Sequence, residues 1–427
     1  MTAGVLDRAG ERGVIDARPP ARVIALAVAL LPLLRPGLED GNLSAVDGFI
    51  LVAIVLSMLW LGLTEVRVRF PMFAGALLYM IAGALSAGVS PYPMVGLVSV
   101  LQDLVLITWA LSIANACRTV GALRVVVSAW AWTSIAWAGV LVVAVFTGMS
   151  GLAGQEIEHG RAALTFVSPN QAGNYFAISL LVVLASPAPR NRILRIAGLV
   201  LISLALVFAA SNASLGGVAA ALVIVWILRV ARRRGTVQAL FSVSVAAVTA
   251  MVVVLVVVRS GVLDAAHESN NLFIRNTIGR SERSAGDRLL RFDQLERLYA
   301  RGGVIGYGAA ATKSVLESQR VWNAKSAHND YIATMVERGV VGAFGLALIW
   351  GALVAMAAAI ASRPLAPAFR SAVPGPEYLV GALVVIALAG VSHEVLHFRH
   401  VWALFGLVAA ASLWGRDRSG ALARGTV

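Results

Sequence analysis

Long apolar segments recur along the 427-residue chain and constrain its fold more than any other feature. Hydrophobic residues make up 59% of the sequence and charged residues only 13%, whereas soluble domains have about 45–50% and about 25%. A chain this apolar has too few polar side chains to cover a surface in water. Because a helix of about 20 apolar residues crosses the hydrocarbon core of a bilayer, the sequence predicts an all-α, polytopic integral membrane protein.

Segments of suitable length and hydropathy predict about 12 transmembrane helices. They cover approximately residues 21–38, 45–64, 70–89, 93–115, 123–148, 168–186, 193–210, 213–230, 238–258, 339–361, 378–396 and 399–415. The first segment is interrupted by Pro32, Arg35 and Pro36 and follows a basic N-terminal stretch, as in a signal peptide. No convincing small-residue cleavage site follows it, so we interpret it as a retained first span.

Arginine and lysine residues are distributed unevenly between the predicted loops. With the N-terminus in the cytoplasm, the cytoplasmic segments carry 20 of the 35 basic residues and the short outer loops carry 3. Cytoplasmic loops of membrane proteins are enriched in these residues. The expected organisation is a cytoplasmic tail over 1–22, nine helices over 23–258, one long extracytoplasmic loop over 259–338, three helices over 339–415 and a cytoplasmic tail over 416–427.

Composition also excludes several classes of partner. The formal net charge of +13 does not indicate nucleic-acid binding, because the arginines gather in short loops between apolar segments. Cys117 is the single cysteine, which excludes an intrachain disulfide and a paired-cysteine metal site. The sequence has no P-loop and no dinucleotide-binding glycine motif after a strand. We therefore expect no nucleic-acid partner, no metal and no other cofactor.

Most of the unusual polar residues fall on the outer side of this topology, among them all six histidines. An outward-facing site excludes ATP and nucleotide sugars as direct substrates, because these are cytoplasmic. Arginine forms bidentate contacts with phosphate, so a lipid diphosphate is the natural ligand for an arginine-rich outer loop. Arginines that only solvate the loop or contact anionic lipid are the alternative.

The long outer loop is expected to contain an amphipathic helix over 287–301, because its leucine and aromatic residues repeat at helical spacing. Its arginine-rich polar face is typical of a helix that lies at the membrane surface. The glycine-rich segment 302–308 predicts a turn after this helix.

Near the end of the loop, His328 and Asn329 precede the tenth predicted span. Histidine titrates near neutral pH, so one placed here can accept a proton from an attacking hydroxyl. The alternative interpretation is a histidine that only caps a helix at the membrane interface.

From His328 to Gly342 the sequence reads His-Asn, nine residues and Gly-x-x-Gly, which resembles the signature of the O-antigen ligase family. Related O-antigen polymerases and protein O-oligosaccharyltransferases share this signature. Other similar pieces occur in the expected order, namely Ser-Pro-Asn-Gln at 168–171, Gly-Asp-Arg at 286–288 and Gly-Tyr-Gly at 306–308. The motifs cover about 165–345, and elsewhere the resemblance is one of topology.

The resemblance implies a GT-C-like membrane glycosyltransferase that moves a glycan from a polyprenyl-diphosphate carrier to an acceptor hydroxyl, on the extracytoplasmic face of the bacterial inner membrane. Arginines would neutralise the diphosphate leaving group, without a metal, and the partners would be this donor, a glycan or lipid-glycan acceptor, and membrane lipids. On this interpretation the catalytic residues are His328, Asn329 and Arg288. The substrate-binding residues would be Arg291, Arg161, Asn170, Ser214 and Arg399.

The chain departs from the family at the outer start of the eighth span. Ser-Arg-Gly is usual there, and its arginine is thought to bind the lipid diphosphate, whereas this chain has Ser-Leu-Gly at 214–216. Either the substrate differs or another arginine contacts the anion, with Arg288, Arg291 and Arg161 as the candidates.

Three further interpretations remain open at this point. A ligase and a polymerase use the same donor and differ only in the acceptor. A transporter or flippase would hold its substrate near the bilayer midplane, where Gln102 and Asp103 are the mid-span candidates. His393, His397 and His400 have near-helical spacing that would allow zinc, but they lack the HExxH order, so we favour the lining of an acceptor cavity or a solvated helix end.

Overall fold

The computed structural model describes residues 18–34, 44–64, 66–153, 161–270, 294–320, 327–362 and 367–423, and within these ranges it contains helices and no β-strand. The named helices are α1 (Arg18–Ala29), α2 (Ala45–Leu63), α3 (Phe73–Val89), α4 (Pro93–Ala116), α5 (Val120–Phe146), α6 (Ser150–Ala153), α7 (Pro169–Ala185), α8 (Arg192–Ala209), α9 (Asn212–Arg234), α10 (Thr236–Arg259), α11 (Val262–His267), α14 (Thr312–Ser318), α15 (Asp330–Ser362), α16 (Pro367–Ala372), α17 (Glu377–Gly390) and α18 (Arg399–Ala423). A further short helix covers 294–302.

A helix occupies each of the segments for which a membrane span is predicted. Seven helices are long and apolar enough to cross a membrane by length and composition, namely α2, α4, α5, α8, α9, α10 and α15. Shorter apolar stretches occur in α1, α3, α17 and α18. The chain is therefore an all-helical, polytopic membrane protein, while the count of 12 spans stays a prediction.

Local sequence signals set several of the helix boundaries. The Ser168 hydroxyl accepts a hydrogen bond from the N–H of Gln171 at 3.3 Å, and Pro169 occupies the first turn of α7. Asn191 begins α8 in a similar way, accepting from the N–H of Ile193 at 2.8 Å. Such caps satisfy N–H groups that have no partner within the helix, which explains the polar residues at these junctions.

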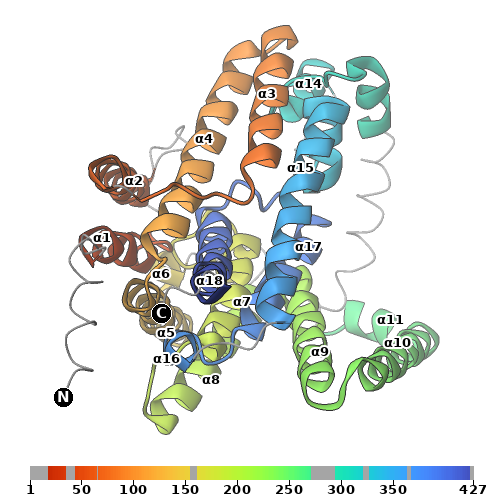
Figure 1. The fold of residues 1–427 in the computed structure, drawn as a ribbon. Coiled ribbons are helices and arrows are strands. Elements are labelled where there is room, and N and C mark those ends of the chain that lie inside the picture. The colour runs from red at the N-terminus through yellow and green to blue at the C-terminus, as the bar shows by residue number, and fades with distance from the viewer. Residues whose placement is uncertain are drawn as a thin grey trace, which may run out of the picture.

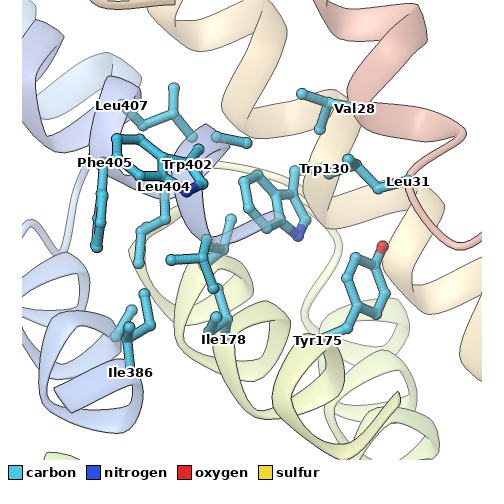
Figure 2. Close-up of a cluster of buried hydrophobic side chains, with 14 of the residues drawn as sticks. Val28, Leu31, Trp130, Tyr175, Ile178, Ile386, Trp402, Leu404, Phe405 and Leu407 are labelled. Atoms are coloured by element: carbon cyan, nitrogen blue, oxygen red, sulfur yellow. The ribbon is translucent and has the colours of Figure 1, made fainter. Parts of the chain in front are cut away.

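The centre of the bundle is formed by α7 and by the first part of α18, whose side chains are buried on nearly all sides. Figure 2 shows Trp130 of α5, Tyr175 and Ile178 of α7, and Trp402 and Phe405 of α18 within one apolar cluster. A helix that is buried all round is apolar on every face. This packing fixes α18, and with it the residues at the start of that helix that reach the site described below.

Helices α3, α4 and α15 run side by side along one edge of the bundle (Figure 1). The backbones of α3 and α15 approach closely at two glycines. A Cβ atom at Gly75 would lie 2.6 Å from the nitrogen of Ile349, and one at Gly345 would lie 2.7 Å from the nitrogen of Tyr79. Small residues permit such close helix packing within membranes, and here they fix the spacing of two walls of the site.

Segments predicted for the same side of the membrane contact one another. On the predicted cytoplasmic side, Arg232 at the end of α9 donates a hydrogen bond to the Ile360 carbonyl at 2.9 Å. On the predicted outer side, Arg399 at the start of α18 pairs with Asp47 of α2, with Nη2 at 2.6 Å from Oδ2. These contacts agree with the orientation derived from the arginine distribution, which itself remains a prediction.

The described part of the outer loop packs against α14 and α15. In the helix over 294–302, which is part of the segment 287–301 predicted to be helical, Leu295 and Leu298 are buried in a cluster with residues of those two helices. Its apolar face therefore contacts protein, whereas we expected it to lie on the membrane surface. The first half of the predicted helix belongs to residues 271–293, which lie outside the described ranges.

Candidate active site

Consecutive residues of the His-Asn motif attach the start of α15 to the connection between α17 and α18. The backbone N–H of His328 donates to Oε1 of Glu394 at 2.8 Å. The side-chain amide of Asn329 donates to the carbonyl of Val391, also at 2.8 Å. Two successive residues thus hold the first half of this connection.

The next two residues, Asp330 and Tyr331, contact further parts of the α17–α18 connection and the end of α17. The buried carboxylate of Asp330 accepts hydrogen bonds from the N–H groups of Val395 at 2.9 Å and Leu396 at 3.3 Å. The Tyr331 hydroxyl donates to the carbonyl of Ala387, at 2.9 Å, near the end of α17. The motif therefore fixes the α17–α18 connection over its whole length.

Asn329 is also the N-terminal cap of α15. Its Oδ1 accepts hydrogen bonds from the N–H groups of Tyr331 at 2.9 Å and Ile332 at 3.0 Å. His328, directly before it, has a φ of 51°, in the left-handed region that few residue types tolerate. The capping role considered from the sequence thus belongs to Asn329, and His328 occupies the turn that leads into the cap.

The two glycine motifs meet at a break in α15. The helix leaves helical geometry at Gly339, where φ is 63° and ψ is −165°. At this break the N–H of Tyr307 donates to the carbonyl of Val336 at 2.9 Å, and the N–H of Val340 donates to the carbonyl of Val304 at 3.0 Å. A Cβ atom at Gly339 would lie 1.9 Å from the Val304 oxygen, so the backbone contact requires glycine. The predicted turn over 302–308 and the Gly-x-x-Gly motif therefore contact each other through backbone hydrogen bonds.

A polar cavity of about 680 Å³ lies between α2, α3, α4, α15 and the α17–α18 connection. Binding pockets for small molecules have similar volumes, about 300–1,000 Å³. Its polar lining comprises Asp47, Tyr79, Ser99, Gln102, Asp103, Asp330, Thr334, Glu337, Arg338, Glu394, His397 and Arg399. On the side of α2 and α4 the lining is apolar and includes Leu51, Val98 and Leu101, which are exposed on the surface of the bundle.

Both arginines of this lining are paired with carboxylates. Arg338 pairs with Asp103 of α4, and its guanidinium carbon lies 4.0 Å from the centre of the Tyr79 ring. Arg399 binds both carboxylate oxygens of Asp47 through two nitrogens. The described lining holds five carboxyl groups and two guanidinium groups, so hydrogen-bonding oxygens outnumber cationic groups.

The other three carboxylates also have hydrogen-bond partners. Glu337 accepts from the Thr312 hydroxyl at 2.6 Å and from the N–H of Ala310 at 2.9 Å. Asp330 and Glu394 bind the backbone groups described above. Since a buried charge is costly unless it is paired or hydrogen-bonded, these contacts keep the carboxylates in place and join segments that are distant in sequence.

His397 presents an imidazole to the cavity from the α17–α18 connection, and the side chain is accessible from it. Its ring packs edge-on against Phe398, with 4.7 Å between ring centres. Within the described ranges, its ring nitrogens have no hydrogen-bond partner. Desolvation lowers the pKa of His397 to about 4, together with the charges of Arg399 and His328. A neutral imidazole in this position is able to accept a hydrogen bond or a proton.

Three predicted substrate-binding residues lie in a separate cluster where α7, α8 and α9 meet. The buried Arg161 donates to Oδ1 of Asn170 at 2.7 Å and to the carbonyl of Ala209 at 3.1 Å. The Ser214 hydroxyl donates to that of Ser211 at 3.0 Å. These residues are not part of the cavity lining. The contacts of Arg161 join α7 to α8, whereas the bond between Ser211 and Ser214 lies within the start of α9. The role of these residues in substrate binding remains a prediction.

The histidine triplet does not converge on one point. Nε2 of the buried His400 lies 2.8 Å from Oδ1 of Asn174, whereas His397 faces the cavity and His393 is not part of its lining. Among the described residues, no group of three or more His, Cys, Asp or Glu side chains is arranged to hold a metal ion.

The predicted site residues thus have different positions. Arg399 lines the cavity, His328 and Asn329 hold its wall, and Arg288 and Arg291 lie outside the described residues. The lining includes His397, which the sequence suggested for the lining of an acceptor cavity. It also includes ionisable residues that the sequence did not assign to the site, namely Asp47, Asp103, Asp330, Glu337, Arg338 and Glu394. Several of these residues could have been found in the sequence as ionisable residues within predicted spans, because such residues are rare and usually functional.

No curated protein matches the chain. Residues 197–347 match the family model described as O-antigen ligase. This segment runs from α8 into α15 and includes the His-Asn and Gly-x-x-Gly motifs that hold the cavity wall. The match covers most of the region in which the motifs resemble the family, and it supports the assignment of the chain to the O-antigen ligase and polymerase family.

Proposed function

We propose that the protein transfers a glycan from a polyprenyl-diphosphate carrier to an acceptor hydroxyl on the extracytoplasmic face of the bacterial inner membrane. The observation that carries this proposal is the polar cavity whose wall is held by the His-Asn motif. A lipid-linked glycan has an apolar chain and a polar head, so its site must contact lipid on one side and offer hydrogen-bonding groups on another.

The two sides of the cavity suit the two parts of this donor. The polyprenyl chain would lie along Leu51, Val98 and Leu101, which are exposed at the outer surface of the bundle. The carboxylates of the opposite wall are hydrogen-bond acceptors and would bind sugar hydroxyls.

The diphosphate requires cations, and in this proposal they come from two places. Arg399 lies at the cavity and offers two parallel N–H donors, which now bind Asp47. A phosphate would take the place of that carboxylate on the same guanidinium group. Arg288 and Arg291 of the long loop, which lie outside the described residues, would add further positive charge.

The transfer needs one displacement at the anomeric carbon, with inversion. The acceptor oxygen forms a bond to this carbon, and the bond from the carbon to the phosphate oxygen breaks. The electron pair leaves on the diphosphate, which the arginines stabilise as its charge develops. The proton of the acceptor hydroxyl passes to a base in the cavity, and His328, which the motif identifies, orients this hydroxyl. Because the arginines neutralise the leaving group, the proposal includes no metal ion.

Glycan analysis of a deletion strain tests this function and separates a ligase from a polymerase. Loss of long-chain polymer from its lipid acceptor, with intact polymer left on the carrier, indicates a ligase. Single repeat units in place of the polymer indicate a polymerase of the same superfamily. Loss of surface glycan together with carrier-linked glycan trapped on the cytoplasmic face would indicate a flippase and contradict the proposal.

A reconstituted assay with a labelled lipid-linked glycan tests the predicted catalytic residues. We expect His328→Ala to lower the transfer rate by about 10²-fold, the cost of a small misplacement of the reacting groups, because His328 holds the wall of the cavity. His328→Asn is the matched control for folding, because asparagine tolerates the left-handed backbone at this position. Arg288→Ala should reduce donor use more than Arg288→Lys, which keeps the charge but loses the bidentate contact. A wild-type rate in His328→Ala would remove this residue from the mechanism.

A further inference from the structure

We propose that His397 is a catalytic residue of this cavity, whose imidazole binds the acceptor hydroxyl and accepts its proton during glycan transfer. This inference rests on the proposed function and assigns a second histidine to the reaction. The sequence suggested His397 only as one of three histidines for a metal or a cavity wall.

The geometry favours His397 because its imidazole is presented to the substrate space. His397 lines the cavity, and its ring nitrogens have no hydrogen-bond partner within the described part of the chain. His328 is not part of the lining, and its backbone N–H donates to Glu394. An acceptor hydroxyl that enters the cavity therefore meets the ring of His397.

The surrounding contacts hold this imidazole in place. On one side, Asp330 binds the N–H groups of the two residues that precede His397. On the other side, Arg399 is bound by Asp47, and the indole N–H of Trp402 donates to the carbonyl of Leu396. Catalytic groups need this kind of support, because small errors in position reduce rates strongly.

The charges around His397 suit a proton acceptor that works when the donor is present. The groups that face it across the cavity are the guanidinium groups of Arg399 and Arg338 and the carboxylates of Asp47, Asp103, Asp330, Glu337 and Glu394. Desolvation and the charges of Arg399 and His328 lower the pKa of His397. An incoming diphosphate adds negative charge, which favours the protonated imidazole.

The step is balanced in atoms and charge. The acceptor O–H proton moves to a ring nitrogen of His397 as the acceptor oxygen bonds to the anomeric carbon. The bond from that carbon to the phosphate oxygen breaks, and its electron pair leaves with the polyprenyl diphosphate. The imidazolium then returns the proton to water.

The test is a kinetic comparison of variants in proteoliposomes with a labelled polyprenyl-diphosphate glycan and its acceptor. We expect His397→Ala to lower kcat by about 10²–10⁴-fold with little change in the KM of the donor. His397→Gln, which keeps a hydrogen-bond acceptor but cannot carry the proton, should remain impaired. His393→Ala is the matched control, because it removes an imidazole from the same connection outside the cavity lining, and it should retain the wild-type rate.

Chemical rescue distinguishes a base from a structural residue. Added imidazoles should restore part of the activity of His397→Ala, and the rescue should depend on the basicity of the added compound. A fully active His397→Ala, or an active His397→Gln, overturns the inference while the wild-type activity keeps the proposed function intact. A wild-type protein without transfer activity overturns both. Absence of rescue in a His397→Ala protein with wild-type thermal stability also contradicts a role as base.

Discussion

The ion pair between Asp103 and Arg338 gives a quantitative test of the cavity wall. We predict that removing either partner destabilises the protein strongly, while removing both costs much less than the sum of the two changes. Both side chains are nearly inaccessible, at 10% and 4% exposure, so each is poorly solvated when its partner is removed. Arg338→Met and Asp103→Leu, singly and combined, are suitable variants because they keep side-chain volume in place.

The expected magnitude follows from the burial of the pair. Breaking a buried ion pair by removing one partner costs about 3–5 kcal/mol, whereas replacing both by apolar residues is often neutral. Arg338 also contacts the Tyr79 ring, and a desolvated cation–π contact contributes about 2 kcal/mol. We therefore expect about 3–5 kcal/mol for each single change, about 0–2 kcal/mol for the double change, and a coupling energy of several kcal/mol.

Unfolding in mixed micelles with increasing SDS fraction, followed by tryptophan fluorescence, measures these free energies. Arg229→Met is the matched control, because Arg229 forms the same kind of pair with Glu377 but is 42% exposed. Exposed pairs contribute about 0–1 kcal/mol, and Arg232 also binds Glu377 at 3.2 Å. Additivity of the Asp103 and Arg338 changes within about 0.5 kcal/mol would refute the coupling that the structure implies.

Three further predictions concern the break at Gly339, the cavity imidazole and the orientation. Gly339→Ala should lower the free energy of unfolding by about 1–3 kcal/mol from backbone strain alone, and its close contact with the Val304 oxygen should lower it further. Thermal melting measures this loss. Gly351→Ala is the control and should melt like the wild type, because Gly351 has open space around it. The pKa of His397 is about 4 in the folded protein and 6.5 without its surroundings. The unfolded state therefore binds more protons between these two values, so the free energy of unfolding should fall as the pH is lowered through this range. The melting temperature of His397→Asn should depend less on pH, and an unchanged dependence would contradict the shift. In intact cells an impermeant thiol reagent should label Ser150→Cys and not Thr236→Cys, since the native cysteine is buried; the opposite result would invert the topology and move the site to the cytoplasm.

Helix positions were predictable because the length of an apolar segment is a local property of the sequence. The helix over residues 330–338 was not, since we expected only a span from residue 339; the kink at Gly339 separates this helix from the predicted span. The break at Gly339 is stabilised by backbone contacts with residues 304–307, which no periodicity reveals. Similarly, the pattern over 287–301 identified an amphipathic helix but not whether lipid or protein covers its apolar face.

The site was partly predictable for a related reason. The spacing of the motif identified His328 and Asn329, yet their contacts with the α17–α18 connection depend on tertiary structure. Asp47 and Arg399 are 352 residues apart in sequence, and neither has a local pattern that indicates the other. His397 has no motif of its own, and its place in the cavity follows from the packing of α17 and α18 around it.

Helix α18 is the last of the described helices to be synthesised, and the cavity is incomplete without it. The ribosome delivers the helices in chain order, so α4, α5 and α7 enter the membrane before the helix that fills the space between them. Until α18 arrives, Asp47 lacks its arginine and the cavity lacks the wall that carries His397. A nascent chain therefore has no assembled cavity, and only the completed bundle can bind a ligand there.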